Sequence, residues 1–527
     1  MRYLLVVCAA CSFHAHAAPG DGAVDAMIDA PPVQPLVRFT SVTSSVAMLR
    51  PGLYGFDVFT TLQNDLDHDV TGVAATLSFG GREAQFRWRD ADRREGVTTL
   101  QPTTVSAHGS VMFHFVVDAR TSAAPPGPVV VNGVATFVDG SRQSAMPSAT
   151  PLSLPFMTMN APIVVTTAMD ETTVSTTTSL REALAAANAA PGADRIVFDP
   201  TLATATIALD RTKGPLPTIT EDLAIDGNGV TMSVDMAWQT MPGSYGFRVS
   251  GGLVAISDLH FKDLAFNYKL EDVSTNNCGA GDFPDGGAIR VDGGTLILDE
   301  NRFSDANVPE KNCYAAALRI HGGTGHRIVH NTFTAEVMDT MYIDTAVKEV
   351  SDNVMSSTAD PTKGDECIFI NSQGNSDLWI TGNTCVDKEY SGVIANGGDA
   401  GDLYLINNTF VRTGIVDLGA VRRSNARTIH ARNNIYVNDN PAAFIGNNAG
   451  ALFDIAYEDA SGSPLCQSCS AITPTNILTS DPLLDSMFVP GPASPAIDSG
   501  QDWIDVNGRV PGHFNGAGPD RGANETP

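Results

Sequence analysis

One short pattern, repeated at intervals of 22 to 30 residues, constrains the fold of this 527-residue chain more than any other feature. Six segments align without gaps around an asparagine: LILDENRF, HRIVHNTF, KEVSDNVM, LWITGNTC, LYLINNTF and IHARNNIY. The asparagines stand at positions 301, 331, 353, 383, 408 and 434. The residue three places before each asparagine is apolar, and Phe, Met, Cys or Tyr stands two places after it. Unrelated strands would not reproduce three positions six times, so the period indicates a repeat architecture.

The repeat predicts a parallel β-helix. In this fold, equivalent residues of successive coils lie about 4.8 Å apart along an axis, so inward positions must be apolar in every coil. The corner between two strands needs a residue that tolerates a left-handed backbone. We expect the recurrent asparagine at this corner, with its amide hydrogen-bonded to the asparagine of the next coil.

A second strand of each coil falls into the same register. Its inward pairs are Ile289/Val291, Leu318/Ile320, Met341/Ile343, Ile368/Ile370 and Val393/Ala395. A polar residue follows each pair: Asp292, His321, Asp344, Asn371 and Asn396. Upstream, Ser179 and Glu182 form the capping-box pattern of one amphipathic helix, 179–190, which we expect to cover the open N-terminal end of the β-helix core.

The region before the helix follows a different pattern. Residues 36–155 alternate apolar and polar at period two, with Gly, Pro and Asp between the runs, as in LYGFDVFTTL and GVAATLSF. Several short strands at this spacing predict a small immunoglobulin-like β-sandwich. Nothing in this region suggests catalysis, so we interpret it as a spacer or an adhesive module.

The N-terminus has the features of an export signal: Arg2, an apolar run and then small residues. Cleavage after Ala17 would release a secreted protein, whereas CAAC ending at Cys11 would place a lipid on that cysteine. A Pro- and Ala-rich tether, 18–35, follows the signal 1–17. No other stretch reaches the roughly 20 apolar residues of a membrane helix, so a lipid on Cys11 is the expected route to a membrane.

Charge and cysteine content agree with export. The net charge is −27 and Lys/Arg residues form no cluster, which argues against nucleic-acid binding. Six cysteines lie outside the signal, and an even number favours disulfides in an exported chain. Pairing by proximity gives 278–313, 367–385 and 466–469; the last pair alternatively forms half of a zinc or redox site.

Three groups of motifs carry a resemblance to known proteins. TSLREALAAANAAPGADRIVF, PLPTITEDLAIDGNG and the N-x-F coils resemble exported bacterial right-handed β-helix proteins of the pectin-lyase-like superfamily. The similarity spans residues 160–527. It implies a right-handed β-helix over 160–455 and a C-terminal tail module over 456–527, which resembles a sorting or anchor domain of bacterial surface proteins.

This superfamily includes polygalacturonases, and the resemblance implies a candidate carboxylate site at Asp339, Asp365 and Glu366. GDEC, residues 364–367, matches the Gly-Asp-Asp-Cys motif of those enzymes except for Glu366. Glycoside hydrolysis needs one carboxyl group as an acid and another to activate water. Carboxyl groups that lie close together raise the pKa of at least one of them, which keeps that one protonated as the acid. Tyr390-Ser391-Gly392 stands where the family has Gly-His-Gly, and no Arg-x-Lys follows.

A uronate lyase would instead need a base. His326 and Lys348 occupy one coil position where other coils carry Leu or Ile, although that position also fits an exposed strand end. His321, His326 and His330 suggest a metal without fixing its geometry. Calcium is the cofactor considered, at Asp498, Asp502, Asp505 and Asn507, but the spacing is not that of an EF-hand and also fits a polar turn.

These patterns favour an exported or surface-displayed β-helix protein that binds extracellular polysaccharide or cell-surface components without demonstrable catalysis. The alternative is a polysaccharide-degrading enzyme, a glycoside hydrolase or uronate lyase, that uses Asp339, Asp365 and Glu366. An enzyme would bring those carboxylates together in an open groove, whereas a scaffold would pair them with neighbouring Arg and Lys.

Overall fold

The computed structural model describes the following residues: 37–52, 55–89, 100–120, 127–172, 176–234, 245–263, 287–304, 316–334, 339–357, 366–388, 391–395, 401–413, 421–423, 428–437, 445–447, 452–456, 459–461, 466–467, 475–501 and 520–523. The signal, the tether and Cys11 lie outside this part of the chain.

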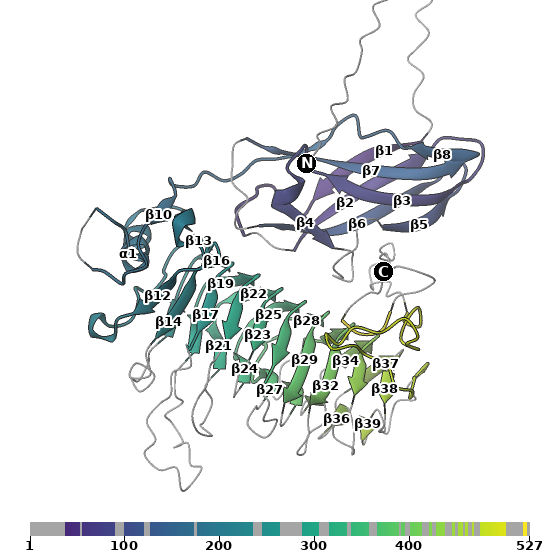
Figure 1. Cartoon of the computed structure of the whole chain (residues 1–527). Coiled ribbons are helices and arrows are strands. Elements are labelled where there is room, and N and C mark those ends of the chain that lie inside the picture. The colour runs from purple at the N-terminus through teal and green to yellow at the C-terminus, as the bar shows by residue number, and fades with distance from the viewer. Residues whose placement is uncertain are drawn as a thin grey trace, which may run out of the picture.

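Three long parallel sheets form a β-solenoid (Figure 1). Sheet 1 has 11 strands: β10 (Ile163–Val165), β11 (Asp194–Phe198), β13 (Leu223–Asp226), β16 (Leu253–Ser257), β19 (Thr295–Asp299), β22 (Thr324–Val329), β25 (Ala346–Ser351), β28 (Leu378–Thr381), β31 (Leu403–Ile406), β34 (Thr428–Arg432) and β37 (Leu452–Ala456). From β13 onward, each coil continues from sheet 1 into sheet 2 and then sheet 3.

Sheet 2 has 10 strands: β12 (Thr206–Leu209), β14 (Thr231–Val234), β17 (His260–Lys262), β20 (Arg302–Ser304), β23 (Thr332–Thr334), β26 (Val354–Ser356), β29 (Thr384–Lys388), β32 (Thr409–Thr413), β35 (Ile435–Val437) and β38 (Asp459–Ser461). Sheet 3 has 9: β15 (Tyr245–Val249), β18 (Gly287–Asp292), β21 (Ala316–Gly322), β24 (Asp339–Ile343), β27 (Glu366–Ile370), β30 (Ser391–Ala395), β33 (Val421–Arg423), β36 (Ile445–Asn447) and β39 (Cys466–Gln467).

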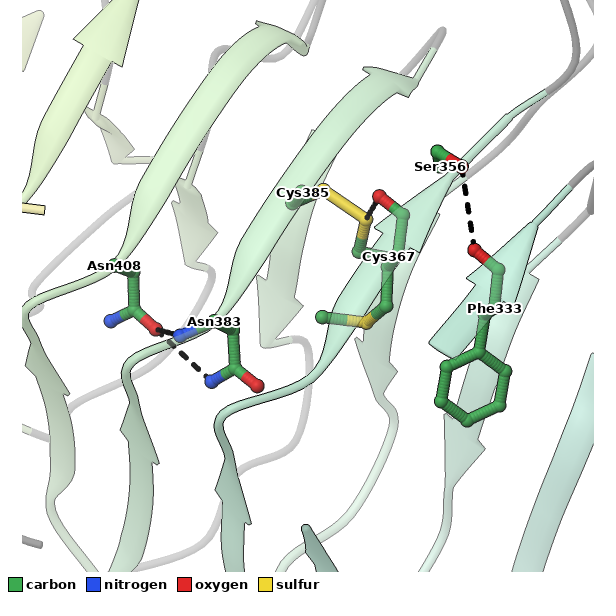
Figure 2. Close-up of a disulfide and its surroundings, with 7 residues drawn as sticks. Phe333, Ser356, Cys367, Asn383, Cys385 and Asn408 are labelled. Carbon is green, nitrogen blue, oxygen red and sulfur yellow. Dashed lines mark hydrogen bonds between the residues drawn. A yellow bond between two sulfur atoms is a disulfide. The ribbon is translucent and has the colours of Figure 1, made fainter. Parts of the chain in front are cut away.

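The predicted asparagine ladder is confirmed. The backbone N–H and the side-chain amide of Asn331 both donate to Oδ1 of Asn353, at 2.9 and 3.0 Å. The same two bonds link Asn353 to Asn383 and Asn383 to Asn408, and Figure 2 shows the last of these links. All of these side chains are buried, so the ladder satisfies polar groups along the core without water.

The prediction of a left-handed backbone at the ladder asparagines is wrong. The positive φ angles belong to the residues one place earlier: Glu300, His330, Asp352, Gly382, Asn407 and Asn433, at 55–65°. These residues make the bend between sheets 1 and 2. The next residue is then free to direct its amide inward, toward backbone carbonyls of its own coil and the preceding one.

The core runs the length of the solenoid. Phe261, Phe303 and Phe333 stack on one another in sheet 2, with ring centroids 4.7 and 4.4 Å apart. Further along the same column, Cys385 pairs with Cys367 of sheet 3 in a disulfide across the core (Figure 2). This confirms the predicted 367–385 pair; the pairs 278–313 and 466–469 involve side chains outside the described part of the chain.

Helix α1 (Leu180–Ala189) has the predicted capping box between Ser179 and Glu182. Its buried residues Leu180, Ala183 and Leu184 join the solenoid core beside β10 and β11, the first strands of sheet 1. Short 3-10 helices span Glu83–Gln85, Pro200–Leu202 and Arg211–Lys213. No helix within the described ranges is long and apolar enough to cross a membrane.

The N-terminal unit, called here the sandwich, consists of two antiparallel sheets around a shared core. One sheet has the order β1-β2-β6-β4: β1 (Val37–Ser44), β2 (Phe56–Asn64), β6 (Ser110–Ala119) and β4 (Phe86–Arg89). The other contains β5 (Leu100–Val105), β3 (Val70–Ser78), β7 (Val129–Asp139), β8 (Ser141–Ser144) and β9 (Leu152–Leu154). The sandwich lies over the outer face of sheet 1 (Figure 1).

The described parts of the C-terminal tail fold back onto the solenoid. The amide of Asn433 donates to the carbonyl of Gln501, and the amide of Asn407 donates to the carbonyl of Asp520. Gly522, with φ at +98°, lies against the corner, where an added Cβ would meet Ile435 and Thr409. The tail therefore occupies the corner between sheets 1 and 2 near the C-terminal end.

Candidate functional site

Polar residues at the carboxyl ends of the sheet 3 strands form a half-exposed row on the outer face of the solenoid. The sheet 3 track is defined here as the strand-end residues Asp292, His321, Asp344 and Asn371 together with Arg248, which lies one residue before the end of β15 and binds Asp292. The inward pairs before them match the sequence prediction: Leu318 pairs with Met341, and Met341 pairs with Ile368. Because the apolar residues point into the core, the polar residue after each pair lies at the surface. Asn396 lies outside the described residues.

Hydrogen bonds join the second half of the track across three coils. Nε–H of Arg319 donates to Nε2 of His321, at 2.5 Å, and Nδ1 of His321 lies 2.9 Å from Oδ2 of Asp344. The amide of Asn371 donates to Oδ1 of Asp344, at 2.6 Å. The His321 ring thus links Arg319 of its own strand to Asp344 of the next coil.

The first half of the track is held by two arginines. Arg248 and Arg290 each donate from Nε to Asp292, both at 2.6 Å. Arg290 also donates to the hydroxyl of Tyr245, at 2.6 Å. The side chain of Arg248 is 50% exposed and that of Asp292 is 21% exposed, so this cation remains open to a ligand while its position is fixed.

Behind the track, cations give way to aromatic rings along one row of sheet 3. Arg248, Arg290, Arg319, Tyr342 and Phe369 are successive register partners in neighbouring coils. The Arg319 guanidinium lies 4.8 Å from the centre of the Tyr342 ring, which stacks on Phe369 at 5.0 Å. Arg319 and Tyr342 are buried, so they support the half-exposed groups in front of them.

Both carboxylates of the track are held in the charged form. Burial by itself raises the pKa of Asp344, but hydrogen bonds from His321 and Asn371, together with the charges of His321 and Arg319, outweigh it and lower the pKa. For Asp292, burial is likewise outweighed by hydrogen bonds from Arg290 and Arg248, and the pKa is lowered. The track and the row behind it thus combine three arginines, Arg248, Arg290 and Arg319, with two carboxylates, in a protein whose net charge is −27.

The structure describes only part of the predicted carboxylate site. Glu366 begins β27 and is buried, at 7% exposure. The backbone of Asp339 begins β24, but its side chain lies outside the described part, as does all of Asp365. Met341 pairs with Ile368, and the same offset places Asp339 opposite Glu366 at the amino ends of their strands. Their roles stay predictions.

The interpretation of His326 and Lys348 as one coil position is wrong. The register shifts within this pair of strands, so that His326 pairs with Val347 and Lys348 is an exposed extra residue. His326 is fully buried in the core, where its Nδ1 accepts from the N–H of Leu296 at 2.9 Å. Burial lowers its pKa to about 4. His326 is therefore a neutral structural residue at neutral pH.

No group of three metal-binding side chains occurs among the described residues. His321 and His330 bind carboxylates of different corners, Asp344 and Asp299. Of the residues considered for calcium, Asp498 donates its backbone N–H to Asp520, and the other three lie outside the described ranges. Calcium stays an untested prediction.

Arg248, Arg290 and Arg319 of sheet 3 were missed by sequence reasoning, although a signal was present. Each stands between two inward apolar residues, as in Phe247-Arg248-Val249 and Leu318-Arg319-Ile320. Alternation along a strand places such a residue on the outer face. Their recurrence in three successive coils therefore predicts a stacked row of cations.

Comparisons with known proteins return similar solved structures at low identity. No family model matches the sequence, and no curated protein matches it. One similar solved structure is a pectate lyase, with 14% identity and a TM-score of 0.43 over 70% of this chain and 98% of that one. Another is the catalytic domain of a GH87 alpha-1,3-glucanase in complex with tetrasaccharides, with 12% identity and a TM-score of 0.29 over 84% and 93%.

Proposed function

We propose that this chain is an exported or surface-displayed protein that binds an acidic polysaccharide along the sheet 3 track. The supporting observation is a pair of half-exposed hydrogen-bonded clusters, Arg248–Asp292 and His321–Asp344–Asn371, held in place by Arg290 and by the buried Arg319. Sugar hydroxyls need both donors and acceptors, and the track offers both. The half-exposed guanidinium of Arg248 is suited to a carboxylate or sulfate group on the sugar.

The form of the track suits a chain-like ligand. Successive coils repeat about every 4.8 Å, so the polar groups line up along the axis and an extended polysaccharide would meet them in sequence. In this proposal the sandwich is an immunoglobulin-like unit, α1 covers the N-terminal end of the core, and the tail module belongs to surface display. A lipid on Cys11 would be the membrane attachment.

The test measures binding of purified protein to polygalacturonate, alginate and neutral dextran. Arg248→Gln should weaken binding to the acidic polymers about tenfold or more, because this half-exposed cation contributes a charge-assisted contact. The control is Arg412→Gln, which removes a comparably exposed arginine paired with Asp387 on sheet 2. Equal effects of the two substitutions, or equal binding to dextran, would contradict the proposal.

Cleavage of the bound chain is the second candidate function. The register favours it, since Asp339 and Glu366 begin adjacent strands of the sheet that carries the track. With Asp365 they would supply an acid and a base for glycoside hydrolysis, or a base for uronate elimination. Loss of depolymerisation in Asp365→Asn, with polymer binding retained, would establish it. Unchanged polymer length with wild-type protein would leave binding alone as the function.

A further inference from the structure

The outer face of sheet 1 has an unusual composition for the surface of a solenoid. Ala255, Ile297 and Val329 form an apolar cluster there, with exposures of 0–2%. Their strand neighbours Val254, Leu296 and Ile328 belong to the inner core, so alternation places the cluster outside. A face with this composition requires a cover, because apolar surface left in water lowers stability.

The sandwich covers this face. In the ion pairs across the interface, the arginines belong to the sandwich and the carboxylates to the solenoid. Arg87 binds Asp299 at 2.7 Å and Glu300 at 2.9 Å, and Arg50 binds Asp222 at 3.0 Å. Arg120 lies 3.5 Å from Glu300. In these described contacts the sandwich supplies the arginines and the solenoid supplies the carboxylates.

Two buried contacts fix the approach of the units. Arg327 of β22 forms a buried ion pair with Glu349 and donates to the carbonyl of Gly55 in the sandwich, at 3.2 Å. Gly55 has a positive φ of 64°, and an added Cβ would collide with the Arg327 guanidinium. The close contact between Arg327 and Gly55 therefore fixes how the sandwich sits on the solenoid. A flexibly tethered spacer would not need such a contact.

We propose that the outer face of sheet 1 is a docking surface for the chain's own sandwich, and that acid releases the sandwich by protonating the carboxylates that hold it. Asp299 is central, because its Oδ1 accepts from both Arg87 and Nδ1 of His330, at 2.7 and 2.6 Å. Asp352 faces the other nitrogen of His330, at 3.8 Å.

The surroundings make this corner sensitive to acid. Asp258, on the preceding coil, has its pKa raised by burial and by the charges of Asp226 and Glu300. Protonation of the solenoid carboxylates in these contacts would remove the negative charge that faces the sandwich arginines, which have no acceptor of their own to offer. Release of the sandwich would leave the arginines solvated and expose the apolar cluster, without breaking the solenoid ladder.

The test uses the full chain with a cysteine placed under the sandwich, Ala255→Cys, and its reaction with dithiodipyridine, which reports thiols in acid as well as at neutral pH. The matched control is Ala431→Cys, fully buried in the solenoid core. Between about pH 7.5 and pH 3, labelling of Ala255→Cys should accelerate at least about tenfold while Ala431→Cys stays protected, because arginine partners lower the pKa of these carboxyl groups. The wild-type rate is subtracted from both.

A second variant tests the interface without acid. Arg87→Gln should accelerate labelling of Ala255→Cys at neutral pH, whereas Arg38→Gln, which removes a pair with Asp65 inside the sandwich, should not. Labelling of the two cysteines in parallel at every pH would mean that the sandwich leaves only on global unfolding. If neither acid nor Arg87→Gln changed the labelling rate of Ala255→Cys, the carboxylates would not be what holds the sandwich on sheet 1. Either result overturns the proposal.

Discussion

The outer faces of sheets 1 and 3 have the same backbone geometry but opposite surroundings. On sheet 1, Arg327 and Glu349 are buried beneath the sandwich, with side-chain exposures of 6% and 0%. On sheet 3, Arg248 and Asp292 pair across coils while remaining 50% and 21% exposed. A solenoid stacks outward side chains in rows on every face. The charged row on sheet 1 is covered by the sandwich, so its charges serve the structure. The charged row on sheet 3 stays open, so its charges are available to a ligand.

The corner between sheets 1 and 2 extends this comparison. Its left-handed residues Glu300 and His330 take part in the charged sandwich interface, whereas Asn407 and Asn433 bind the C-terminal tail through amides. The upstream corner therefore depends on protonation and the downstream corner does not. The same backbone position thus holds two segments of the chain by different chemistry.

The strongest way to break the comparison is to neutralise one carboxylate on each face. Glu349→Gln leaves the buried Arg327 charge without its partner and should lower the free energy of unfolding by about 3–5 kcal/mol. The matched change Asp292→Asn should lower it by about 1 kcal/mol or less, because water solvates Arg248. Urea unfolding measures both. Similar losses would mean that burial does not separate the two faces.

The asparagine ladder is the frame on which both faces rest. Asn353→Ala removes three donated and two accepted hydrogen bonds inside the core and should lower the free energy of unfolding by about 3 kcal/mol or more. Asn371→Ala, at an exposed position, should lower it by less than about 1 kcal/mol. Thermal and urea unfolding of the two variants measure both losses of free energy. Equal losses would mean that a position in the ladder does not make an asparagine more important for stability.

A buried histidine gives the core its own dependence on pH, separate from that of the interface. The pKa of His326 is about 4 in the folded chain and about 6.5 when unfolded, so stability is complete above pH 6.5 and falls as pH decreases toward 4. The loss approaches about 3 kcal/mol. His326→Gln should flatten this slope, because glutamine does not titrate. Glutamine can also accept the bond from the backbone, as Gln373 accepts from the N–H of Val347 in a later coil. An unchanged slope would assign the acid sensitivity elsewhere.

The smallest expected effect concerns the fit between sandwich and solenoid. Gly55→Ala adds a methyl against Arg327 at a left-handed position, whereas Gly127→Ala adds one at a left-handed position with no neighbour within 4 Å. Both variants carry about 1 kcal/mol of backbone strain. Gly55→Ala should lose about 1 kcal/mol more in thermal unfolding. Equal losses would show that the approach of Arg327 to Gly55 is not tight.

The repeat made the solenoid predictable, because inward positions and the amide ladder impose the same residue types on every coil. The corner conformation was not predictable in the same way. Asparagine is the most common non-glycine residue in left-handed backbone. Its recurrence therefore suggested that the ladder asparagines are left-handed, whereas the residues before them are. The observed left-handed residues include Glu300, His330 and Asp352, whose tolerance depends on contacts with other segments.

The candidate site was predictable only in part. Asp292, His321, Asp344 and Asn371 were picked out as polar residues after the inward pairs, but their hydrogen bonds depend on neighbouring coils and on Arg319. The motif around Asp365 directed attention to the amino ends of the same strands. A motif match identifies residue types, whereas burial and partners decide which side chains meet a ligand.

Periodicity in the sequence was enough to determine the parallel β-helix and its stacked asparagines, and proximity in the sequence predicted the disulfide between Cys367 and Cys385. Only the tertiary structure decided that the sandwich covers sheet 1, that His326 lies in the core and that a polar row remains open on sheet 3. The reason is physical: local repetition dictates how each coil resembles the next. Contacts between Arg87 and Asp299, more than 200 residues apart, have no periodic signature in the chain.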